Sequence, residues 1–241
     1  LWVEPRPEAE TESESAEALL VSTSLTSASA SANVERPSSL PIIAVPGTAQ
    51  SVGRPDRGYL ANGIQLPKND ALYTVRNPAR AYGSSHAIAL LQSGIAAFRE
   101  SSGYRGALVI GDMSDRNGGR FKPHRSHRTG RDVDIALPLR ENAARGATAK
   151  NTGAVDWRAT YRLIKAFLAT GQVRYIFLSR SHQGLLYRSV RAAGVPASEL
   201  ANVLQFPSRT KNMIVRHSPG HTSHIHVRFK CGPLEASCQE L

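Results

Sequence analysis

Long apolar runs are absent from this sequence. No stretch approaches the roughly 20 apolar residues that a membrane-spanning helix needs. The run from Ala18 to Leu25 is short and follows glutamates, so it does not match the apolar region of a signal peptide. The chain starts at Leu1 and not at methionine, and we interpret this residue as a processing or truncation point. The lack of a signal peptide therefore does not indicate a cytoplasmic protein.

Cysteine is scarce as well. Cys231 and Cys238 are the only two and fall within the last eleven residues, where either a local disulfide or two free thiols would fit. Neither lies in a setting that suggests a nucleophile, and the paired spacing of a zinc finger is missing.

Several catalytic motifs are also missing. The sequence contains no Gly-x-Ser-x-Gly, no His-Glu-x-x-His and no Gly-x-x-x-x-Gly-Lys. Their absence argues against a nucleophile elbow, a helix-based zinc protease and a phosphate-binding loop. The aromatic-interleaved basic strand of an RNA-binding sheet is absent too.

Acidic residues are few outside the N-terminal segment. The chain of 241 residues has a net charge of +11, from 30 Lys and Arg against 19 Asp and Glu. Residues 1–40 hold seven Glu and two Arg, a net charge of −5, so the remainder carries +16. So basic a surface attracts polyanions such as nucleic acid, anionic lipid or an anionic wall polymer, and charge alone does not choose among them.

The composition divides the chain near residue 40. Residues 1–40 are rich in Glu, Ser, Ala and Thr. They lack the apolar side chains that offset the entropy of ordering, so we expect a disordered acidic tether. Residues 41–241 are long enough for one domain with a sizeable core.

Apolar periodicity predicts the elements of this domain. One helix is indicated by apolar residues at helical spacing: Ile88, Leu91, Ile95 and Phe98. A second helix is expected after a capping Asp156 and should end at Gly171. Strands are expected at 107–110, 132–137, 173–178 and 223–229, and short helices at 185–193 and 198–204. A long loop, from Gly111 to Arg131, should separate the first two strands, and such loops are commonly functional or disordered.

Six of the eight histidines fall in two clusters. The first is HRSHRTGRDVD, from His124 to Asp134, and the second is HSPGHTSHIH, from His217 to His226. His124 and His127 alone could belong to a basic, solvated surface stretch. A His-x-His strand is more specific, because alternation forces both rings onto one face. The two clusters together favour a metal site.

Alternation along the expected strands sorts the polar side chains. Asp132 and Asp134 on one strand, and His224 and His226 on the other, lie on faces opposite the core. If the two strands pair, imidazoles and a carboxylate converge on one patch, which His127 in the loop can reach. His, Asp and His around one metal, with a fourth position for water, suit catalytic zinc.

At these residues the chain resembles the penicillin-insensitive murein endopeptidases. These belong to a larger group of zinc peptidases that includes lysostaphin-type enzymes, D-Ala-D-Ala dipeptidases and the hedgehog signalling domain. The resemblance spans about residues 45–238 and rests on four blocks: PGTAQSVG with NGIQLP, LVIGDMSDRNGGRF, HRSHRTGRDVDI and HTSHIHVRFKC. It implies an α+β fold with a small antiparallel β-sheet core, flanking helices and long active-site loops. It also implies the substrate, the D-alanyl–meso-diaminopimelyl cross-link of peptidoglycan, and a place in the periplasm or cell envelope.

The resemblance assigns roles to single residues. The family's His-x-x-Gly-x-x-x-Asp pattern matches His127 and Asp134, and its last zinc ligand matches His226. These residues imply one Zn²⁺ per chain. His224 matches the catalytic base, and His221 matches a further active-site histidine.

Three further features follow from the same comparison. His124 matches a histidine beside the metal and is included among the candidate metal ligands. Cys231 and Cys238 are implied to form a disulfide. Some relatives carry an Asp-x-x-His pair that would hold a second metal, and because ATAKNTGAVDW has no such pair, we predict a single metal.

These residues predict a metal-assisted hydrolysis. A neutral His224 would accept the proton of water and later donate it to the leaving amine. His221, as an imidazolium, would stabilise the oxyanion. Asp132 is expected to orient a ring from behind the ligands. Arg120 is a candidate for binding a substrate carboxylate, since a guanidinium can bind carboxylates bidentately.

Two other functions stay open. A metal-bearing domain could hold murein without cutting it, and loss of His224 or of a zinc ligand would mark such a domain, yet all are present. A nucleic-acid-binding protein would lose affinity steeply with salt. We expect peptidoglycan as the partner, no nucleic acid and no membrane span, and the sequence leaves the oligomeric state open.

Overall fold

The computed structural model describes residues 39–240. The predicted tether, residues 1–40, lies almost entirely outside the described residues, so its disorder stays a prediction. Ser39 is the first described residue, and its backbone N–H and hydroxyl donate hydrogen bonds of 2.6 and 3.0 Å to the carboxylate of Glu100. None of the helices in the described part is long and apolar enough to cross a membrane.

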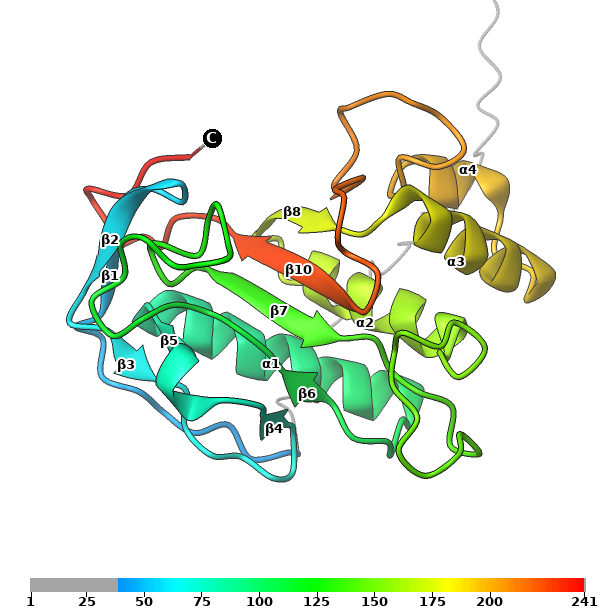
Figure 1. Ribbon diagram of the computed structural model, residues 1–241, viewed down its shortest axis with the longest axis horizontal. Coiled ribbons are helices and arrows are strands. Elements are labelled where there is room, and N and C mark those ends of the chain that lie inside the picture. The colour runs from blue at the N-terminus through cyan, green and yellow to red at the C-terminus, as the bar shows by residue number, and fades with distance from the viewer. Residues whose placement is uncertain (1–38, 241) are drawn as a thin grey trace, which may run out of the picture. The chain divides into compact units, whose positions relative to one another are not determined.

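A six-stranded mixed sheet forms the centre of the fold (Figure 1). In spatial order its strands are β4 (Thr74–Val75), β6 (Val109–Ile110), β7 (Asp132–Ala136), β10 (His224–Phe229), β8 (Val173–Phe177) and β9 (Val215–Arg216). The pairs β6–β7, β7–β10 and β10–β8 are antiparallel. Short parallel pairs, β4–β6 and β8–β9, extend the two edges. The predicted α+β fold and its antiparallel core are confirmed, with parallel edges added.

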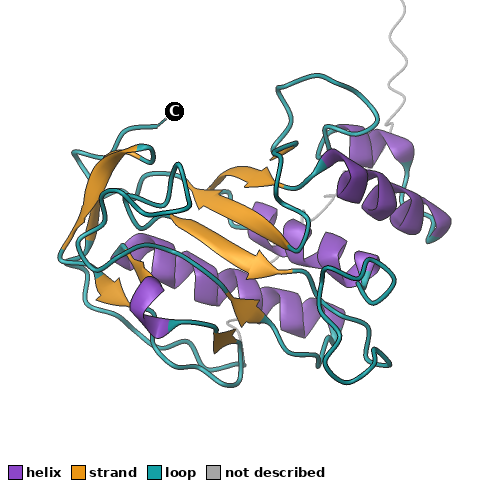
Figure 2. Cartoon of the chain, viewed as in Figure 1, coloured by secondary structure: helices purple, strands orange, loops and turns teal. Residues whose placement is uncertain are grey.

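Helices lie behind this sheet and beside it (Figure 2). They are α1 (Ser85–Ser102), α2 (Trp157–Ala169), α3 (Arg180–Ala192), α4 (Ala197–Ala201) and a 3-10 turn at Pro78–Arg80. The expected apolar face of α1 is fully buried, and the Asp156 carboxylate caps α2 by accepting a 2.8 Å bond from the N–H of Ala159. Helix α3 begins five residues before the predicted 185, because the Ser179 hydroxyl caps it. Helix α4 ends at Ala201, before the predicted 204.

Two short two-stranded sheets were not expected from the sequence. They pair β1 (Gln50–Arg54) with β2 (Arg57–Ala61), and β3 (Ile64–Gln65) with β5 (Tyr82–Gly83). They support the predicted long loop between β6 and β7, which joins β2 through a 3.1 Å bond from Leu60 N–H to Asn117 O. Gly118 in this loop has a φ of +65°, and a Cβ there would lie 2.1 Å from Arg128 O, so only glycine fits.

The alternation predicted for the two central strands is confirmed. Val133 and Ile135 of β7, and Ile225 and Val227 of β10, belong to the buried core. Their neighbours in the sequence face the other side of the sheet. The side chains of the two histidines and two aspartates therefore share one polar face, as expected for strands with a period of two.

A disulfide follows β10, as the resemblance implied. Cys231 and Cys238 are bonded, with their Cα atoms 5.7 Å apart. The short loop that they close lies against β1, where the N–H of Gly53 donates to Ser237 O at 2.8 Å. Disulfides persist in oxidising compartments, so this bond fits an exported protein.

Candidate metal centre

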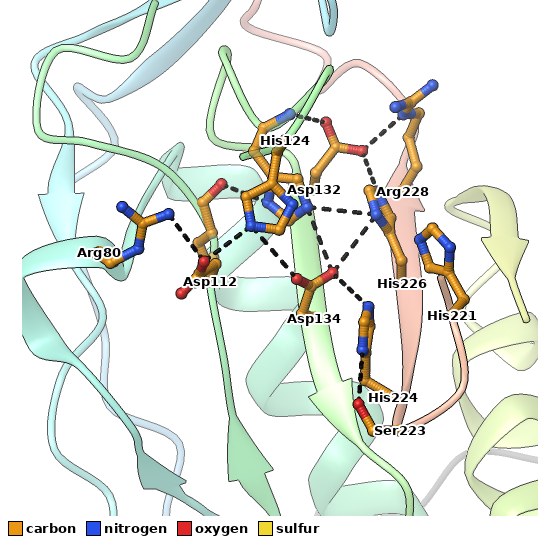
Figure 3. A network of polar contacts seen from close by, with 12 residues as sticks. Arg80, Asp112, His124, Asp132, Asp134, His221, Ser223, His224, His226 and Arg228 are labelled. Atoms are coloured by element: carbon orange, nitrogen blue, oxygen red, sulfur yellow. Dashed lines mark hydrogen bonds and ion pairs between the residues drawn. The ribbon is translucent and has the colours of Figure 1, made fainter. Parts of the chain in front are cut away.

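The register of β7 and β10 builds the base of the site. His226 lies directly opposite Asp134, and Arg228 lies opposite Asp132. Both aspartates are buried, with Asp132 fully inaccessible. Figure 3 shows their carboxylates pointing toward the histidines of β10. The predicted convergence of imidazoles and carboxylates is therefore present.

His127 enters the site from the long loop in an uncommon backbone conformation. Its φ is +65°, in the left-handed region that costs a non-glycine residue about 1–2 kcal/mol. Two bonds hold it there: its N–H donates to Asp132 Oδ2 at 3.2 Å, and its Nδ1 lies 2.8 Å from Met113 O. Because a carbonyl only accepts, Nδ1 carries the proton and Nε2 presents a lone pair to the site.

Three ligand atoms meet at one point. His127 Nε2 lies 3.3 Å from Asp134 Oδ1 and 3.3 Å from His226 Nδ1. His226 Nδ1 lies 3.5 Å from the same carboxylate oxygen. The other nitrogen of His226, Nε2, lies 2.7 Å from Asp132 Oδ1 and donates to it, so Nδ1 also carries a lone pair.

This arrangement suits a cation. Two imidazole lone pairs and a carboxylate oxygen face one another, and Asp134 Oδ1 is buried without a hydrogen bond to the described residues. Buried polar atoms are normally hydrogen-bonded, and the three imidazoles at 3.3–3.6 Å from this oxygen meet it only as ion pairs, which leaves room for a ligand that accepts electron pairs. Two imidazoles, each oriented by a group behind it, and one carboxylate fit a metal ion.

The electrostatics of the metal-free site point the same way. Burial raises the pKa of the Asp134 carboxyl, but His127 and the other rings outweigh burial and hold that pKa below its usual range. Burial and then the charge of His127 lower the pKa of His226 to about 4. Burial also acts to lower the pKa of His127, but Asp134 outweighs it and the net pKa is raised. These directions keep Asp134 ionised and His226 neutral, the forms that bind a cation, and a bound metal would displace the proton that Asp134 favours on His127.

His124 lies at the edge of this centre. Its ligand nitrogen, a ligand nitrogen of His127 and a carboxylate oxygen of Asp134 form a set of atoms all within 4.8 Å of one another. Its Nε2 is nevertheless 2.8 Å from Asp112 Oδ2 and 3.9 Å from Asp134 Oδ2. Asp112 in turn is bonded to Arg80 at 2.9 Å. As drawn in Figure 3, His124 is therefore directed at Asp112, whereas His226 Nδ1 lies 3.3 Å from His127 Nε2.

His224 and His221 stand beside the ligands. His224 Nε2 lies 3.6 Å from Asp134 Oδ1, and its side chain is 24% exposed. The ring of His221 is 5.0 Å from that of His224 and 5.5 Å from that of His226, measured between centroids. Burial lowers the pKa of both rings, His221 and His224 alike. Both rings are in reach of a substrate at the metal.

Arg120 is not brought to this centre by any contact. Its side chain is exposed and forms no hydrogen bond or ion pair with a described residue. Its role as a carboxylate ligand stays a prediction. Arg228 is much closer to the ligands, because its Nε donates to Asp132 Oδ1 at 2.7 Å.

Two hollows open on either side of the ligands. One, of about 830 Å³, has largely apolar walls that include Val109, Leu137 and Leu139, and it reaches His224 and Asp134. The other, of about 570 Å³, reaches His221 and His226. Pro123 and His124 line both hollows. The two hollows therefore adjoin each other beside the proposed ligands.

Comparison with known proteins decides the family. The family model described as penicillin-insensitive murein endopeptidase matches residues 51–179. The chain belongs to the penicillin-insensitive murein endopeptidase family. Relatives of that name from Escherichia coli O157:H7 and Citrobacter koseri are each 27% identical over 212 residues, which cover 81% of this chain and 72% of each relative.

Membership of the penicillin-insensitive murein endopeptidase family agrees with the geometry. The family is one of metallopeptidases, and His124, His127 and Asp134 form a set that can hold a metal. The matched residues end at Ser179, before β10. The fold adds His226 and its neighbours to the same site by strand pairing.

Sequence reasoning missed the residues that surround the ligands. Asp112 restrains His124, and Arg80 and Arg76 restrain Asp112. An aspartate two residues after a buried strand was a usable signal for Asp112. No sequence signal linked the arginines to it, because they come from a segment 32 to 36 residues away.

Proposed function

We propose that this chain is a zinc-dependent endopeptidase that hydrolyses D-alanyl–meso-diaminopimelyl cross-links of murein in the periplasm or cell envelope. The observation that carries the proposal is the convergence of His127 Nε2, His226 Nδ1 and Asp134 Oδ1 between two hollows. Family membership supplies the substrate class, and the +16 charge outside residues 1–40 suits an anionic wall polymer.

One zinc ion per chain suits this ligand set. Two neutral imidazoles and one carboxylate leave a fourth position open, as in catalytic zinc sites. Asp132 behind His226, and the Met113 carbonyl behind His127, fix the tautomers that direct a lone pair at the ion. His124 is proposed as a neighbour of the metal held by Asp112, and not as a fourth ligand.

The chemistry divides between the ion and the protein. When bound, zinc supplies a Lewis acid that polarises the scissile carbonyl and lowers the pKa of water towards ~7. His224 is the proposed base: its Nε2 faces the centre, and burial lowers its pKa, so the ring is neutral at neutral pH. Nε2 can then accept the proton of water and return it to the leaving amine.

His221 is proposed as a second active-site group. Its Nδ1 lies 3.0 Å from Pro219 O and donates to it, so a neutral ring offers only a lone pair at Nε2. Stabilisation of an oxyanion needs a donor there, and burial lowers the pKa of this ring. His221 can therefore act as the expected imidazolium only if it gains a proton during the reaction.

A murein-binding domain without activity is the second candidate. It would keep the fold, the basic surface and the metal. The presence of His224 beside the ligands favours the enzyme, because a binding domain does not need a base at that position.

Digestion of purified murein tests the proposal. The metal-loaded chain should release fragments with newly freed D-alanine carboxyl groups and diaminopimelate amines, identified by chromatography and mass spectrometry. Chelator should stop the release, and added zinc should restore it. Tight binding to murein without any fragment release would favour the binding domain, and salt-sensitive binding to any DNA would favour a nucleic-acid-binding protein.

A further inference from the structure

Arg228 is buried beside the metal centre, yet most of its guanidinium has no protein partner. Its side chain is 7% exposed. Its Nε donates to Asp132 Oδ1 at 2.7 Å, and its two terminal nitrogens make no hydrogen bond with the described residues. Figure 3 shows a dashed contact at only one of the three nitrogens. Among the described residues, the terminal nitrogens of Arg228 are not buried without a partner, so they reach solvent and can donate to an anionic ligand.

The free end of Arg228 borders the smaller hollow. This hollow of about 570 Å³ is also lined by His221 and His226, and the guanidinium carbon of Arg228 lies 5.5 Å from the centre of the Phe177 ring. Arg125 adds an exposed second cation to the lining. The carboxylate in the lining, Asp56, is already paired with Arg54 at 3.3 Å. The hollow is thus basic, and it adjoins the ligands.

We propose that Arg228 binds the substrate carboxylate that lies next to the scissile amide on its amine side. This inference rests on the proposed function. In the cross-link, the leaving nitrogen is attached to a carbon that also carries a carboxylate, so an anionic group accompanies the scissile bond at a fixed short distance. The two terminal N–H groups of a guanidinium match such a carboxylate bidentately.

The position of Arg228 supports this assignment over Arg120. Arg228 lies two residues from His226 on one strand face, roughly 7 Å along the strand. Asp132 joins the two, because one oxygen accepts from both His226 Nε2 and Arg228 Nε at 2.7 Å. The guanidinium is therefore fixed relative to the metal ligand before substrate arrives.

The assignment gives the substrate a direction. The amine side of the cross-link would occupy the hollow at Arg228, and the acyl side would extend through the larger, largely apolar hollow beyond His224. A base at His224 then lies between the two sides, where the proton must pass from water to the leaving nitrogen.

A pair of substrates tests the role of Arg228 separately from its bond to Asp132. One is a cross-linked muropeptide dimer with a free carboxylate next to the scissile amide, and the other is the same dimer with that group as a primary amide. The wild-type enzyme should favour the acid by roughly 10–100-fold in kcat/KM, the scale of a charge-assisted bond. In Arg228→Gln the ratio of kcat/KM for the acid to that for the amide should fall to about one, with zinc content retained. Cleavage of the amide should change much less than cleavage of the acid.

Other outcomes overturn the inference. Equal rates of the wild-type enzyme on the acid and the amide would contradict the role of Arg228 without any variant. An Arg228→Gln variant that slows cleavage of both substrates equally would contradict it as well. If the preference for the acid over the amide is lost in Arg125→Gln but kept in Arg228→Gln, Arg125 binds the substrate carboxylate and Arg228 does not. Arg158→Gln, an exposed charge-matched control on α2, should keep both rates.

Two further results, loss of zinc in Arg228→Gln and lack of activity in the wild type, also have a definite meaning. If Arg228→Gln loses zinc, Arg228→Lys carries the test: the point charge of lysine should lower the acid-to-amide ratio several-fold, and an unchanged ratio refutes the role. If the zinc-loaded wild type cuts neither dimer, the proposed function itself fails, and this inference fails with it.

Discussion

His226 Nε2 lies 2.7 Å from Asp132 Oδ1, while the other nitrogen of the same ring faces Asp134 Oδ1 at 3.5 Å. One imidazole thus bridges a carboxylate that orients it and the carboxylate with which we propose it shares a metal. Asp132 also accepts bonds from the His127 N–H and from Arg228 Nε. Burial raises the pKa of the Asp132 carboxyl, but Arg228 and His226 outweigh burial and keep that pKa well below its usual range. A permanently ionised Asp132 therefore fixes the ligand tautomer.

Replacing Asp132 by asparagine should weaken metal binding without abolishing it. The asparagine amide has the shape of the carboxylate but no charge, and its NH2 group can donate to His226 Nε2. The replacement therefore removes the charge that fixes the tautomer of His226. We expect a 10–100-fold loss in metal affinity, typical of groups behind a ligand. Competition with a chromophoric chelator measures the loss. Asp115→Asn, an exposed change in the same loop, is the control, and equal affinities in the two variants would contradict the role.

Removal of a ligand should have a larger effect. His127→Ala and His226→Ala should each lower metal affinity by more than roughly 100-fold, because each takes away one of three protein ligands. His124→Ala should lose much less, since its Nε2 is bonded to Asp112 at 2.8 Å. Elemental analysis after dialysis gives the metal content, and His217→Ala serves as an exposed histidine control. A larger loss in His124→Ala than in His226→Ala would show that the ligand set is His124, His127 and Asp134.

Asp112 should make stability depend on pH in acid. Burial raises its pKa, but hydrogen bonds from Arg80, His124 and Arg76 outweigh burial and lower the pKa to about 2. A lowered pKa contributes stability that is present above the unfolded value of about 4 and is lost as pH falls through the folded value. The contribution is on the order of 2 kcal/mol.

Urea unfolding of the metal-free protein at several pH values measures this contribution. The difference in unfolding free energy between wild type and Asp112→Asn should be largest at neutral pH and should shrink between about pH 4 and pH 2. Metal must be removed first, so that its release in acid does not add to the slope. A difference that stays constant over this range would rule out the ionised carboxylate as its source.

The parts of the site predicted from sequence are those that local periodicity determines. A strand period of two places Asp134 and His226 on one face whatever the rest of the chain does, and strand pairing then brings them together. Helix α1 was predictable for the same reason, through its apolar spacing. The roles of Asp112 and Arg228 depend on contacts between segments far apart in the sequence, Asp112 with His124 and Arg228 with Asp132. No local pattern predicts these contacts.

The orientations of the histidine rings could not be predicted from the sequence either. The spacing of His124 and His127 is compatible with two ligands, yet the Met113 carbonyl directs one ring at the centre and Asp112 holds the other at its edge. The short strands β1, β2, β3 and β5 were missed because their pairing depends on contacts with the long loop and the C-terminal segment, and only a few of their residues are buried.

Replacing His224 by alanine should separate catalysis from metal binding. Its Nε2 lies 3.6 Å from Asp134 Oδ1, yet the proposed site already supplies three protein ligands, so zinc content should be retained while cross-link hydrolysis falls by about 10²–10⁴. In the wild type, burial lowers the pKa of this ring below its usual 6.5, and a bound cation lowers it further. The ring must be neutral to accept a proton, so kcat/KM should be flat near neutrality and decline only below pH 6.5. Zinc content and muropeptide release are measured on one preparation. Zinc lost together with activity would make His224 a ligand, and unchanged activity would make His221 the next candidate for the base.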